Sequence, residues 1–314
     1  MPLSSANPNL VKTALDEVLW GRYSKAPAES IGNAETPQLF KQLTIDRAAV
    51  IETEIMGPGK WSKNLEDTAP EEASFTIGNT TTINVDEWDQ DLPVSKRFFD
   101  DDQHDTVTKA VSDMARQAIN SRDENALDIY AGGFDATLTP DAAYLWSDSH
   151  TNLNGNTIDT LESGVFNPAN FEILVRKLVE QKDQRGRLGG HTPDGGAFLV
   201  PPVLFPDAQE FLKSELKPNS TDNNLNYVSL IYPGLAIFES PWAGSTYNDY
   251  ANAQTAHYLV SADHSIRRRV REALNTVLVD WQFDSKRRYK YRGAFREVVY
   301  AATWEGSVAS TGTV

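Results

Sequence analysis

Four consecutive residues carry the types of side chain that hydrolases use: Ser147, Asp148, Ser149 and His150. A nucleophilic serine needs a base and a carboxylate that approach it from separate segments, and residues adjacent in sequence do not meet in that way. The surrounding sequence also lacks the G-x-S-x-G pattern that exposes a catalytic serine. We interpret the stretch as a turn closed by its own side-chain hydrogen bonds. A soluble acidic hydrolase that uses Asp148 and His150 remains the alternative function from another class.

Asp148 and His150 could also bind a metal ion, but a zinc site needs three or four ligands. The other histidines are scattered along the chain: His104, His191, His257 and His264. The sequence has no cysteine, which excludes thiolate ligands, disulfide bonds and a cysteine nucleophile. We therefore predict no catalytic residues, no metal site and no cofactor.

A glycine-rich segment between Gly186 and Gly196 could suggest a loop that binds phosphate. It lacks the G-x-x-x-x-G-K-[ST] pattern of such loops. It also leads into an apolar run at 197–200, whereas phosphate-binding loops lead into the first turn of a helix, whose amides face the anion. We expect a surface loop between a helix and a buried strand.

The charges of the chain are segregated. The formal net charge is -15, and residues 44–105 hold 15 acidic and 5 basic residues. Residues 261–300 hold 5 acidic and 10 basic residues. A net negative chain lacks the excess of Lys and Arg that general binding to nucleic acid requires. Two solvated faces would explain the segregation, but in a protein that assembles the two segments would be complementary surfaces of neighbouring subunits.

These charged residues are the candidate contacts between subunits. The acidic set is Glu66, Asp67, Glu71, Glu72, Asp86, Glu87, Asp89 and Asp91. The basic set is Arg267, Arg268, Arg269, Arg271, Lys286, Arg287, Arg288, Lys290 and Arg292. Strand alternation places the cations of 288–292 on one face and Tyr289 and Tyr291 on the other, so we expect the tyrosines in the core. The charge-reversal pair Arg288→Glu with Glu72→Arg tests one version of this pairing.

Three elements follow one another in the first part of the chain. Residues 1–35 are rich in Pro, Ser, Ala and Asn, and we expect a loosely held arm in which apolar residues recur at helical spacing between Leu10 and Tyr23. Residues 48–98 are expected to form an extended loop of two alternating, β-branched segments, joined by a stretch rich in Gly, Pro and Glu. A long helix with one apolar face is expected to begin near Asp100 and to end before Gly132. Because an isolated two-stranded ribbon is marginally stable in water, we expect the loop to contact another subunit.

Helix and strand signals alternate over residues 134–280, which favours an α+β fold. Asn167-Pro168 marks the start of a helix. Expected strands are Ala197–Val200, Tyr227–Tyr232, Leu235–Ser240 and His257–Val260, with a helix at Phe205–Leu216. A further helix is expected at Arg267–Leu274, followed by strands in 281–314. No stretch of about 18 apolar residues occurs, so no membrane span is expected.

Four short segments carry a resemblance to a known family: LWSDSHTN at 145–152, FLVPP at 198–202, FESPW at 238–242 and ATWEG at 302–306. With the order of elements, they resemble the major capsid (head) proteins of tailed bacteriophages, in particular the Mu-like major head subunit. The resemblance implies the tailed-phage major capsid fold, shared with herpesvirus and encapsulin shell proteins. It maps an N-terminal arm to 1–45, an extended β-hairpin loop to 46–98, the spine helix of the peripheral domain to 99–133, an axial domain to 134–280 and returning peripheral strands to 281–314.

The function implied by the resemblance is structural. Copies of the chain would assemble through pentamers and hexamers into an icosahedral shell, enclosing double-stranded DNA without sequence-specific binding. Implied partners are a separate scaffolding protein, a portal and a decoration protein. The implied location is the virion, after assembly in the host cytoplasm. An encapsulin-type compartment that encloses a cargo enzyme is the alternative within this fold.

Overall fold

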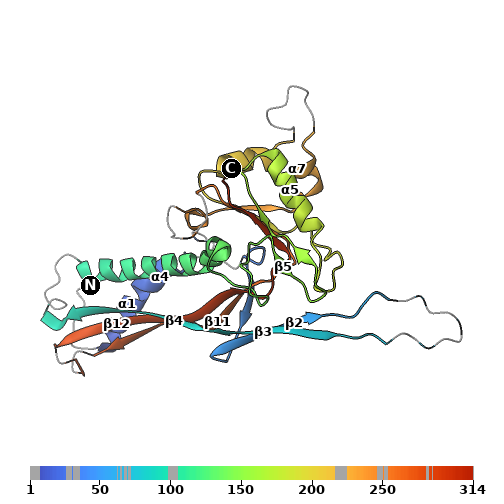
Figure 1. The fold of residues 1–314 in the computed structure, drawn as a ribbon. Helices are drawn as coiled ribbons and strands as arrows, with labels where there is room; N and C mark the ends of the chain where they lie inside the picture. The colour runs from blue at the N-terminus through green and yellow to red at the C-terminus, as the bar shows by residue number, and fades with distance from the viewer. Residues whose placement is uncertain are drawn as a thin grey trace.

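Two layers of helix and sheet make up the body of the protein, and a two-stranded hairpin projects from it (Figure 1). The structure is a computed structural model of the 314-residue chain. It describes residues 8–25, 30, 36–61, 63, 66, 69, 72–97, 105–215, 225–245, 250, 254–280, 283–284 and 286–313.

A four-stranded sheet forms the first layer, in the order β1 (Lys41–Thr44), β11 (Ile266–Val279), β12 (Arg288–Ala301) and β4 (Asp86–Ser95). β1 runs parallel to β11, and the other neighbours are antiparallel. Arg292 pairs with Asp91 in the register of β12 and β4. The buried side chains of Tyr289 and Tyr291 confirm that the aromatic residues of this strand lie in the core.

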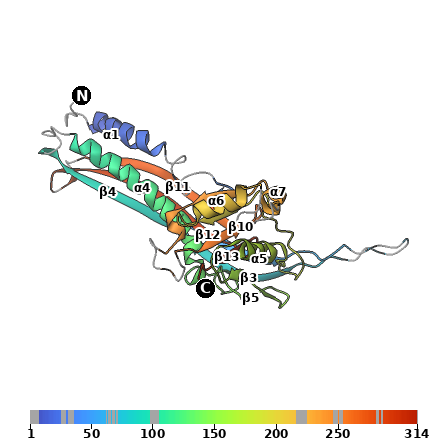
Figure 2. The ribbon, with the colours of Figure 1, turned by 90° about the horizontal axis from the view of Figure 1, so that it is seen from above.

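Two helices pack against this sheet, α4 (Thr106–Ala131) and α1 (Pro8–Tyr23), and Figure 2 shows them running side by side along its strands. With 26 residues, α4 is about 39 Å long. Its apolar stripe is buried, as the sequence predicts, and meets Val11, Leu15 and Leu19 of α1. The predicted start of this helix falls partly on residues 98–104, which lie outside the described residues.

The helix of the N-terminal arm lies on the body of its own subunit. The carboxylate of Asp16 accepts hydrogen bonds from the hydroxyls of Tyr291, at 2.6 Å, and Thr276, at 2.8 Å. Burial alone would raise the pKa of Asp16, but hydrogen bonds from Lys12, Tyr291 and Thr276 lower it overall. α1 is therefore fixed to β11 and β12 of its own subunit.

A five-stranded sheet forms the second layer, in the order β7 (Leu161–Glu162), β13 (Ser307–Ser310), β10 (His257–Val260), β8 (Ala197–Val200) and β9 (Ala236–Glu239). The helices of this layer are α5 (Pro168–Val179), α6 (Phe205–Lys213) and α7 (Tyr227–Ile231). Shorter elements are η1 (Gly132–Phe134), η2 (Pro241–Ala243) and the pair β5 (His150–Thr151) and β6 (Thr157–Ile158).

α5 begins where the sequence predicts. The side chain of Asn167 accepts a hydrogen bond from the amide of Asn170 at 2.9 Å, and proline follows at the first helical position. Phe171, Leu174 and Leu178 are fully buried against the five-stranded sheet, α6 and α7. Local capping and the apolar stripe together explain this helix.

The two layers share one aromatic junction at the end of α4. The indole nitrogen of Trp146 donates to the carbonyl of Tyr130 at 2.8 Å, and the Tyr130 hydroxyl donates to the carbonyl of Leu39 at 2.8 Å. Gly133 is required here because a Cβ would stand 2.3 Å from the indole nitrogen of Trp146. None of the helices among the described residues is long and apolar enough to cross a membrane.

Several predicted elements differ from the structure. The segment 227–231 is a short helix, because the side chain of Asn226 accepts the amide of Val228 and caps it. The predicted helix at 267–274 is wrong, since β11 continues through it and hydrogen bonds to β1 and β12.

The layers also divide the chain differently from the predicted domains. β11, within the expected axial range 134–280, belongs to the four-stranded sheet. β13, within the expected peripheral range 281–314, belongs to the five-stranded sheet. β4, within the expected loop 46–98, is an edge strand of the four-stranded sheet.

Candidate functional site

The turn at 147–150 is a structural element. The hydroxyls of Ser147 and Ser149 lie 3.0 Å apart, and the amide of Ser149 donates to the Ser147 hydroxyl at 3.2 Å. Asp148 is exposed, whereas His150 is fully buried and its Nδ1 lies 2.9 Å from a carboxylate oxygen of Asp141. The interpretation as a self-capped turn is thus confirmed, and Asp148 and His150 do not form a dyad.

Asp141 is the partner of His150 that the sequence did not reveal. Hydrogen bonds from His150 and Thr139 outweigh the effect of burial and lower the pKa of Asp141. The second ring nitrogen of His150 lies 3.1 Å from the carbonyl of Leu145. Both nitrogens are engaged inside the protein, so this pair positions a loop. Among the described residues no group of three or more His, Asp or Glu side chains is placed to hold a metal ion.

The projecting hairpin consists of β2 (Ala49–Met56) and β3 (Thr76–Asn84), which pair antiparallel as predicted. One face bears apolar side chains that are more than half exposed: Ile51 at 64%, Ile55 at 58% and Ile77 at 63%. Ile55 stands directly opposite Ile77 in the register. Phe75, 69% exposed, lies just before β3. The hairpin therefore presents an apolar face that its own subunit leaves largely uncovered.

The other face of the hairpin is fixed to the body by two carboxylates. Glu52 receives the guanidinium of Arg267 at 2.8 Å on both oxygens and that of Arg269 at 3.1 Å. The Tyr300 hydroxyl also donates to Glu52. Burial opposes ionisation, but the Tyr300 hydrogen bond and the Arg267 charge hold the pKa of Glu52 below its ordinary value.

Glu54 is 2% exposed and lies against the second layer. It accepts hydrogen bonds from the side-chain amides of Asn79, at 3.0 Å, and Gln184, at 3.4 Å. Burial raises the pKa of this carboxyl. Gly78 admits the side chain of Leu153, because a Cβ at Gly78 would stand 2.5 Å from a methyl carbon of that leucine.

Arg185, which directly precedes the glycine-rich segment, binds the chain next to the loop-side ends of β2 and β3. Its Nε donates to the carbonyl of Gly57 at 2.9 Å and its Nη2 to the carbonyl of Ser74 at 3.0 Å. The carboxylate of Asp183 accepts the amides of Arg185 and Arg187 and so shapes the turn. Gly186, with φ +80°, closes it. The loop expected from the sequence is present, and its function in the fold is to anchor the hairpin.

The charged residues that we proposed as contacts between subunits differ in burial and in their ion-pair partners. Arg268 is 1% exposed and binds the buried carboxylate of Glu297 at 2.8 Å, together with Arg122 at 2.9 Å. Arg268 is therefore a core residue, and its expected role in a surface contact is wrong because the side chain is enclosed.

Other candidates bind carboxylates of their own chain. Arg292 binds Asp91 at 2.6 Å, Arg288 binds Asp284 at 2.8 Å and Lys290 lies 3.8 Å from Asp284. Glu87 lies 3.5 Å from Arg296. Some of the opposite charges that the sequence predicts to pair between subunits thus pair within one subunit.

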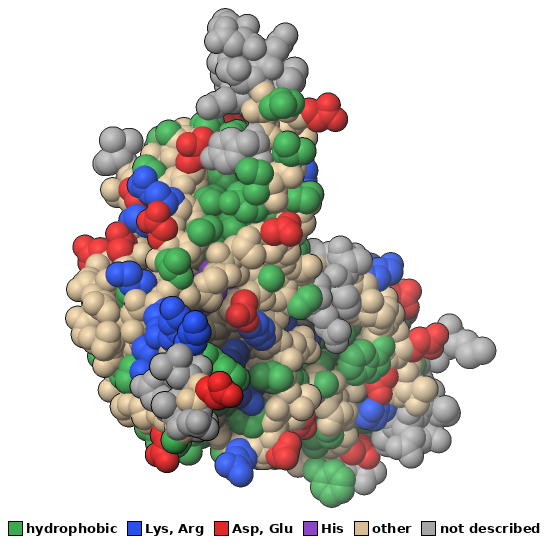
Figure 3. All heavy atoms as spheres, turned by 90° about the vertical axis from the view of Figure 1, so that its right-hand side faces the viewer, with side chains coloured by type: hydrophobic (Ala, Val, Ile, Leu, Met, Phe, Trp, Pro, Cys, Tyr) green, Lys and Arg blue, Asp and Glu red, His purple; other side chains and the backbone are tan. Residues whose placement is uncertain are grey.

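Among the described residues, the remaining candidates form no ion pair within 4 Å, although the charge of Asp89 acts on Arg292. Glu66, Glu72, Asp86, Asp89, Lys286 and Arg287 are exposed, and Arg271 is half-buried. Asp67 and Glu71 lie outside the described residues. Figure 3, seen from the side toward which the hairpin projects, shows side chains of both charges interspersed with apolar ones.

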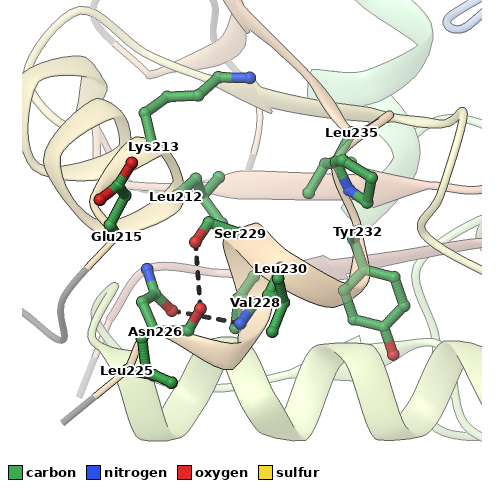
Figure 4. A pocket seen from close by; sticks show the side chains of 11 residues that line it. Leu212, Lys213, Glu215, Leu225, Asn226, Val228, Ser229, Leu230, Tyr232 and Leu235 are labelled. Carbon is green, nitrogen blue, oxygen red and sulfur yellow. Dashed lines mark hydrogen bonds between the residues drawn. The ribbon is translucent and has the colours of Figure 1, made fainter.

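A cavity of about 430 Å³ lies beside α6 and α7 (Figure 4). Its polar side chains are used in local structure: Ser229 donates to the carbonyl of Asn226 at 3.0 Å, and Asn226 binds the carbonyl of Ser214 at 3.1 Å. The other lining residues are mainly apolar, including Leu212, Leu225 and Leu230. The Ser229 hydroxyl donates to the backbone carbonyls of Asn226 and Ser214, so it is used in the local structure.

The sequence profile of the phage capsid proteins matches residues 78–308 of this chain. The chain belongs to the phage capsid protein family. No match was found among curated protein sequences. The family assignment confirms the resemblance read from the sequence, while the Mu-like subgroup stays a prediction.

Solved structures confirm the fold of this capsid protein. The capsid of an empty GTA particle is 12% identical with a TM-score of 0.56, over 88% of this chain and 89% of that chain. A virus-like particle from Pyrococcus furiosus is 7% identical with a TM-score of 0.53, over 94% and 98%. The capsid of Myoviridae phage XM1 is 10% identical with a TM-score of 0.50, over 86% and 89%.

Replacing Arg185 by alanine is expected to loosen the hairpin of this capsid protein where β2 and β3 meet their connecting loop. Two hydrogen bonds that each contribute about 1 kcal/mol would be lost, so amides of β2 and β3 should exchange with deuterium roughly thirtyfold faster. Hydrogen exchange with mass spectrometry measures this. Arg187→Ala, on an exposed neighbour in the same turn, is the control and should leave the exchange rates unchanged. Equal rates in both variants would show that Arg185 does not hold the hairpin.

Glu305 makes the stability of the capsid protein depend on pH. Burial, with the charges of Asp183 and Glu54, raises its pKa from 4.5 to about 7. Between these values the folded carboxyl keeps a proton that the unfolded chain has lost, so stability falls as pH rises and stays lower above pH 7.

Glu305→Gln should therefore stabilise the protein at pH 8, by at most about 3 kcal/mol, and have little effect near pH 4.5. Urea unfolding at the two pH values measures the difference. Glu239→Gln, on an exposed side chain of β9, is the control and should change stability at neither pH. A Glu305→Gln variant less stable than the parent at pH 8 would contradict the argument.

Proposed function

We propose that many copies of this chain assemble into the closed icosahedral head shell of a tailed virus, around packaged double-stranded DNA. The observation that carries the proposal is the hairpin, which is held rigidly on one face and exposes an apolar face on the other. Side chains such as Ile51, Ile55 and Ile77 gain free energy only if another surface covers them. We propose that this surface belongs to a neighbouring copy of the chain.

The anchoring of the hairpin supports this role. Ion pairs to Glu52 and hydrogen bonds from Arg185 connect the hairpin to both layers of the body. A rigid projection loses less conformational entropy on association than a loose one. Each contact between subunits can then be modest, because the shell is stabilised by many such contacts at once.

Exposed charges would add specificity to these contacts. Glu66 and Glu72 of the hairpin loop are exposed, as are Lys286 and Arg287 before β12. We retain the hypothesis that such residues pair between subunits. Glu72→Arg combined with Arg287→Glu is one test, because Arg288 already binds Asp284 of its own chain. The net charge of -15 would keep the inner wall from adhering to DNA during packaging.

The wider assembly follows from the same proposal. Pentamers and hexamers would form the shell in the host cytoplasm, with a scaffolding protein, a portal and a decoration protein as further partners, and the subunit would end in the virion. Its role would be structural and not enzymatic. The alternative within this fold is an encapsulin-type compartment. What the particles contain, DNA or a protein cargo, distinguishes the two functions.

Negative-stain microscopy and sedimentation of the purified chain test the proposal. The expected result is hollow closed particles, alone or with a scaffolding protein from the same virus. Particles isolated from infected or induced cells should contain double-stranded DNA, whereas a protein cargo would indicate the compartment. A chain that stays monomeric under every such condition would overturn the proposal.

A further inference from the structure

A second cavity, with a volume of about 380 Å³, lies between α4 and the four-stranded sheet. Its wall is built from α1, α4, β4, β11 and β12, and Leu19 and Leu274 contribute to its apolar part. The volume lies within the range of about 300–1,000 Å³ that is typical of sites for small molecules. The cavity therefore has the size of a ligand site, and its side chains indicate which class of ligand fits.

The cavity occurs where bulk is missing from the face of the sheet that α4 covers. In the register of β12 and β4, Phe295 stands opposite Trp88. Two residues away on the same face, Gly293 stands opposite Gln90. A side chain at Gly293 would enter this space, since a Cβ there would stand 3.0 Å from the methyl carbon of Met114. One cross-strand position is therefore open beside an aromatic pair.

Trp88 and Phe295 form an aromatic wall of the cavity. Their rings stack with centroids 6.2 Å apart and planes 10° apart. Phe295 is 5% exposed, whereas Trp88 is 37% exposed, so part of the indole is available for a further contact. Aromatic rings prefer an offset stack or an edge-to-face arrangement with a neighbouring ring. A flat ring in the open position would find such a neighbour on this wall.

The polar side chains that face the cavity are neutral. Those of Gln90, Gln117 and Ser121 line it and form no hydrogen bond with another residue that the structure describes. Asp89 also lines the cavity, but alternation along β4 places its carboxylate on the opposite face from Gln90, where its charge acts on Arg292. A carboxamide both donates and accepts hydrogen bonds. The cavity thus offers a ligand donors and acceptors without a charge.

We propose that this cavity is a binding site for a small, neutral, flat heteroaromatic molecule that carries both hydrogen-bond donors and acceptors. The ring would extend the stack of Trp88 on Phe295 and fill the space that Gly293 leaves open. The amides of Gln90 and Gln117 would bind its polar edge. An ionised ligand is disfavoured, because it would be buried without an opposite charge.

A ligand in this position would contact the helix of the N-terminal arm and the body at once. Leu19 of α1 lines the cavity together with Ala118 of α4 and Leu274 of β11. A ligand that binds only the folded chain stabilises it, so the thermal unfolding midpoint should rise with ligand concentration. The site lies within one chain, and its test therefore does not depend on assembly.

Adenine is a suitable probe, because it is flat, neutral and carries both donors and acceptors. Isothermal titration calorimetry of the purified chain should detect its binding. Trp88→Ala should weaken the affinity at least about tenfold, since a stacked aromatic side chain contributes this much to binding of a base. Trp20→Ala is the matched control, because Trp20, 39% exposed on α1, does not line the cavity. The control should bind adenine as the parent does.

Two further variants test the open position and the polar edge. Gly293→Val fills the space with a residue that favours strands and should abolish binding. Gln117→Leu, at an exposed position of α4, should weaken binding about fivefold through the loss of one hydrogen bond. Circular dichroism checks that each variant folds, and Trp88→Ala keeps the test decisive if Gly293→Val does not.

Two results would overturn the inference: no binding of adenine by the parent, or equal affinity in the parent and in Trp88→Ala. Equal affinity in the parent and in Gln117→Leu would overturn the assignment of a polar ring. A crystal structure with adenine stacked against Trp88 would confirm the site directly. Failure of the inference would leave the proposed function intact, because assembly does not require this ligand.

Discussion

Glu297→Gln is expected to lower the free energy of unfolding by about 3–5 kcal/mol. Glu297 is 1% exposed, and its carboxylate binds two guanidinium groups, those of Arg268 at 2.8 Å and Arg122 at 2.9 Å. Glutamine has nearly the same shape but no charge. Two buried cations would then lose the carboxylate that both of them bind, which costs far more than a hydrogen bond between neutral groups.

Urea unfolding followed by circular dichroism measures this effect. Asp91→Asn is the matched control, because Asp91 also binds an arginine of β12 but on the solvent side of the sheet. An exposed ion pair of this kind contributes little, so the control should unfold at the same urea concentration as the parent. If Glu297→Gln yields no soluble protein, Glu297→Asp takes its place, because it keeps the charge but moves it away from the two guanidinium groups. Glu297→Asp should unfold at a lower urea concentration than the parent and the control. Identical midpoints for Glu297→Gln and the control would contradict the argument.

The buried ion pairs of Glu297 with Arg268 and Arg122 explain why the helix predicted for 267–274 is wrong. Ile266, Val270 and Leu274 recur every four residues, which is typical of a helix. In β11 the buried positions include Arg268 and Thr276, polar side chains whose partners, Glu297 and Asp16, lie on other elements. Alternation in a strand cannot be recognised when a charged residue faces the core, because its compensation is decided by tertiary structure.

Elements with strong local signals were predicted well. β8, β10 and the start of α5 follow from apolar runs and an Asn-Pro cap, and α4 follows from a long apolar stripe. The anchors of the hairpin carry no such signal. Arg185 is 128 residues away from Gly57 in the chain, so only the fold brings them together. The charged candidates show the same limit, since Arg292 and Asp91 became neighbours through the pairing of β12 with β4.

The exposed face of the hairpin is expected to decide assembly without affecting the subunit. The test variant carries Ile55→Lys and Ile77→Glu, which stand directly opposite one another on β2 and β3. Opposite charges across a strand pair are favourable, so the hairpin itself should keep its register. The net charge of the chain is also unchanged.

Assembly should respond strongly to this change. Burial of two isoleucines against a neighbour contributes about 3–5 kcal/mol per contact, and the variant replaces this gain with the cost of desolvating two charges. The protein concentration needed to form particles should rise at least about a hundredfold, since each factor of ten corresponds to about 1.4 kcal/mol. Light scattering and negative-stain microscopy over a concentration series measure it, and urea unfolding should show a subunit as stable as the parent.

The control places the same charges on another exposed apolar pair, Leu138→Lys with Tyr144→Glu. These residues also face each other across an antiparallel bridge and are 57% and 42% exposed, but they belong to neither β2 nor β3. Loss of assembly in the hairpin variant alone would locate the decisive contact on β2 and β3. If the hairpin variant forms normal particles at the parent's concentration, the apolar face is not covered by a neighbour. A shell that buried two new charges at every such contact would lose much of its stability.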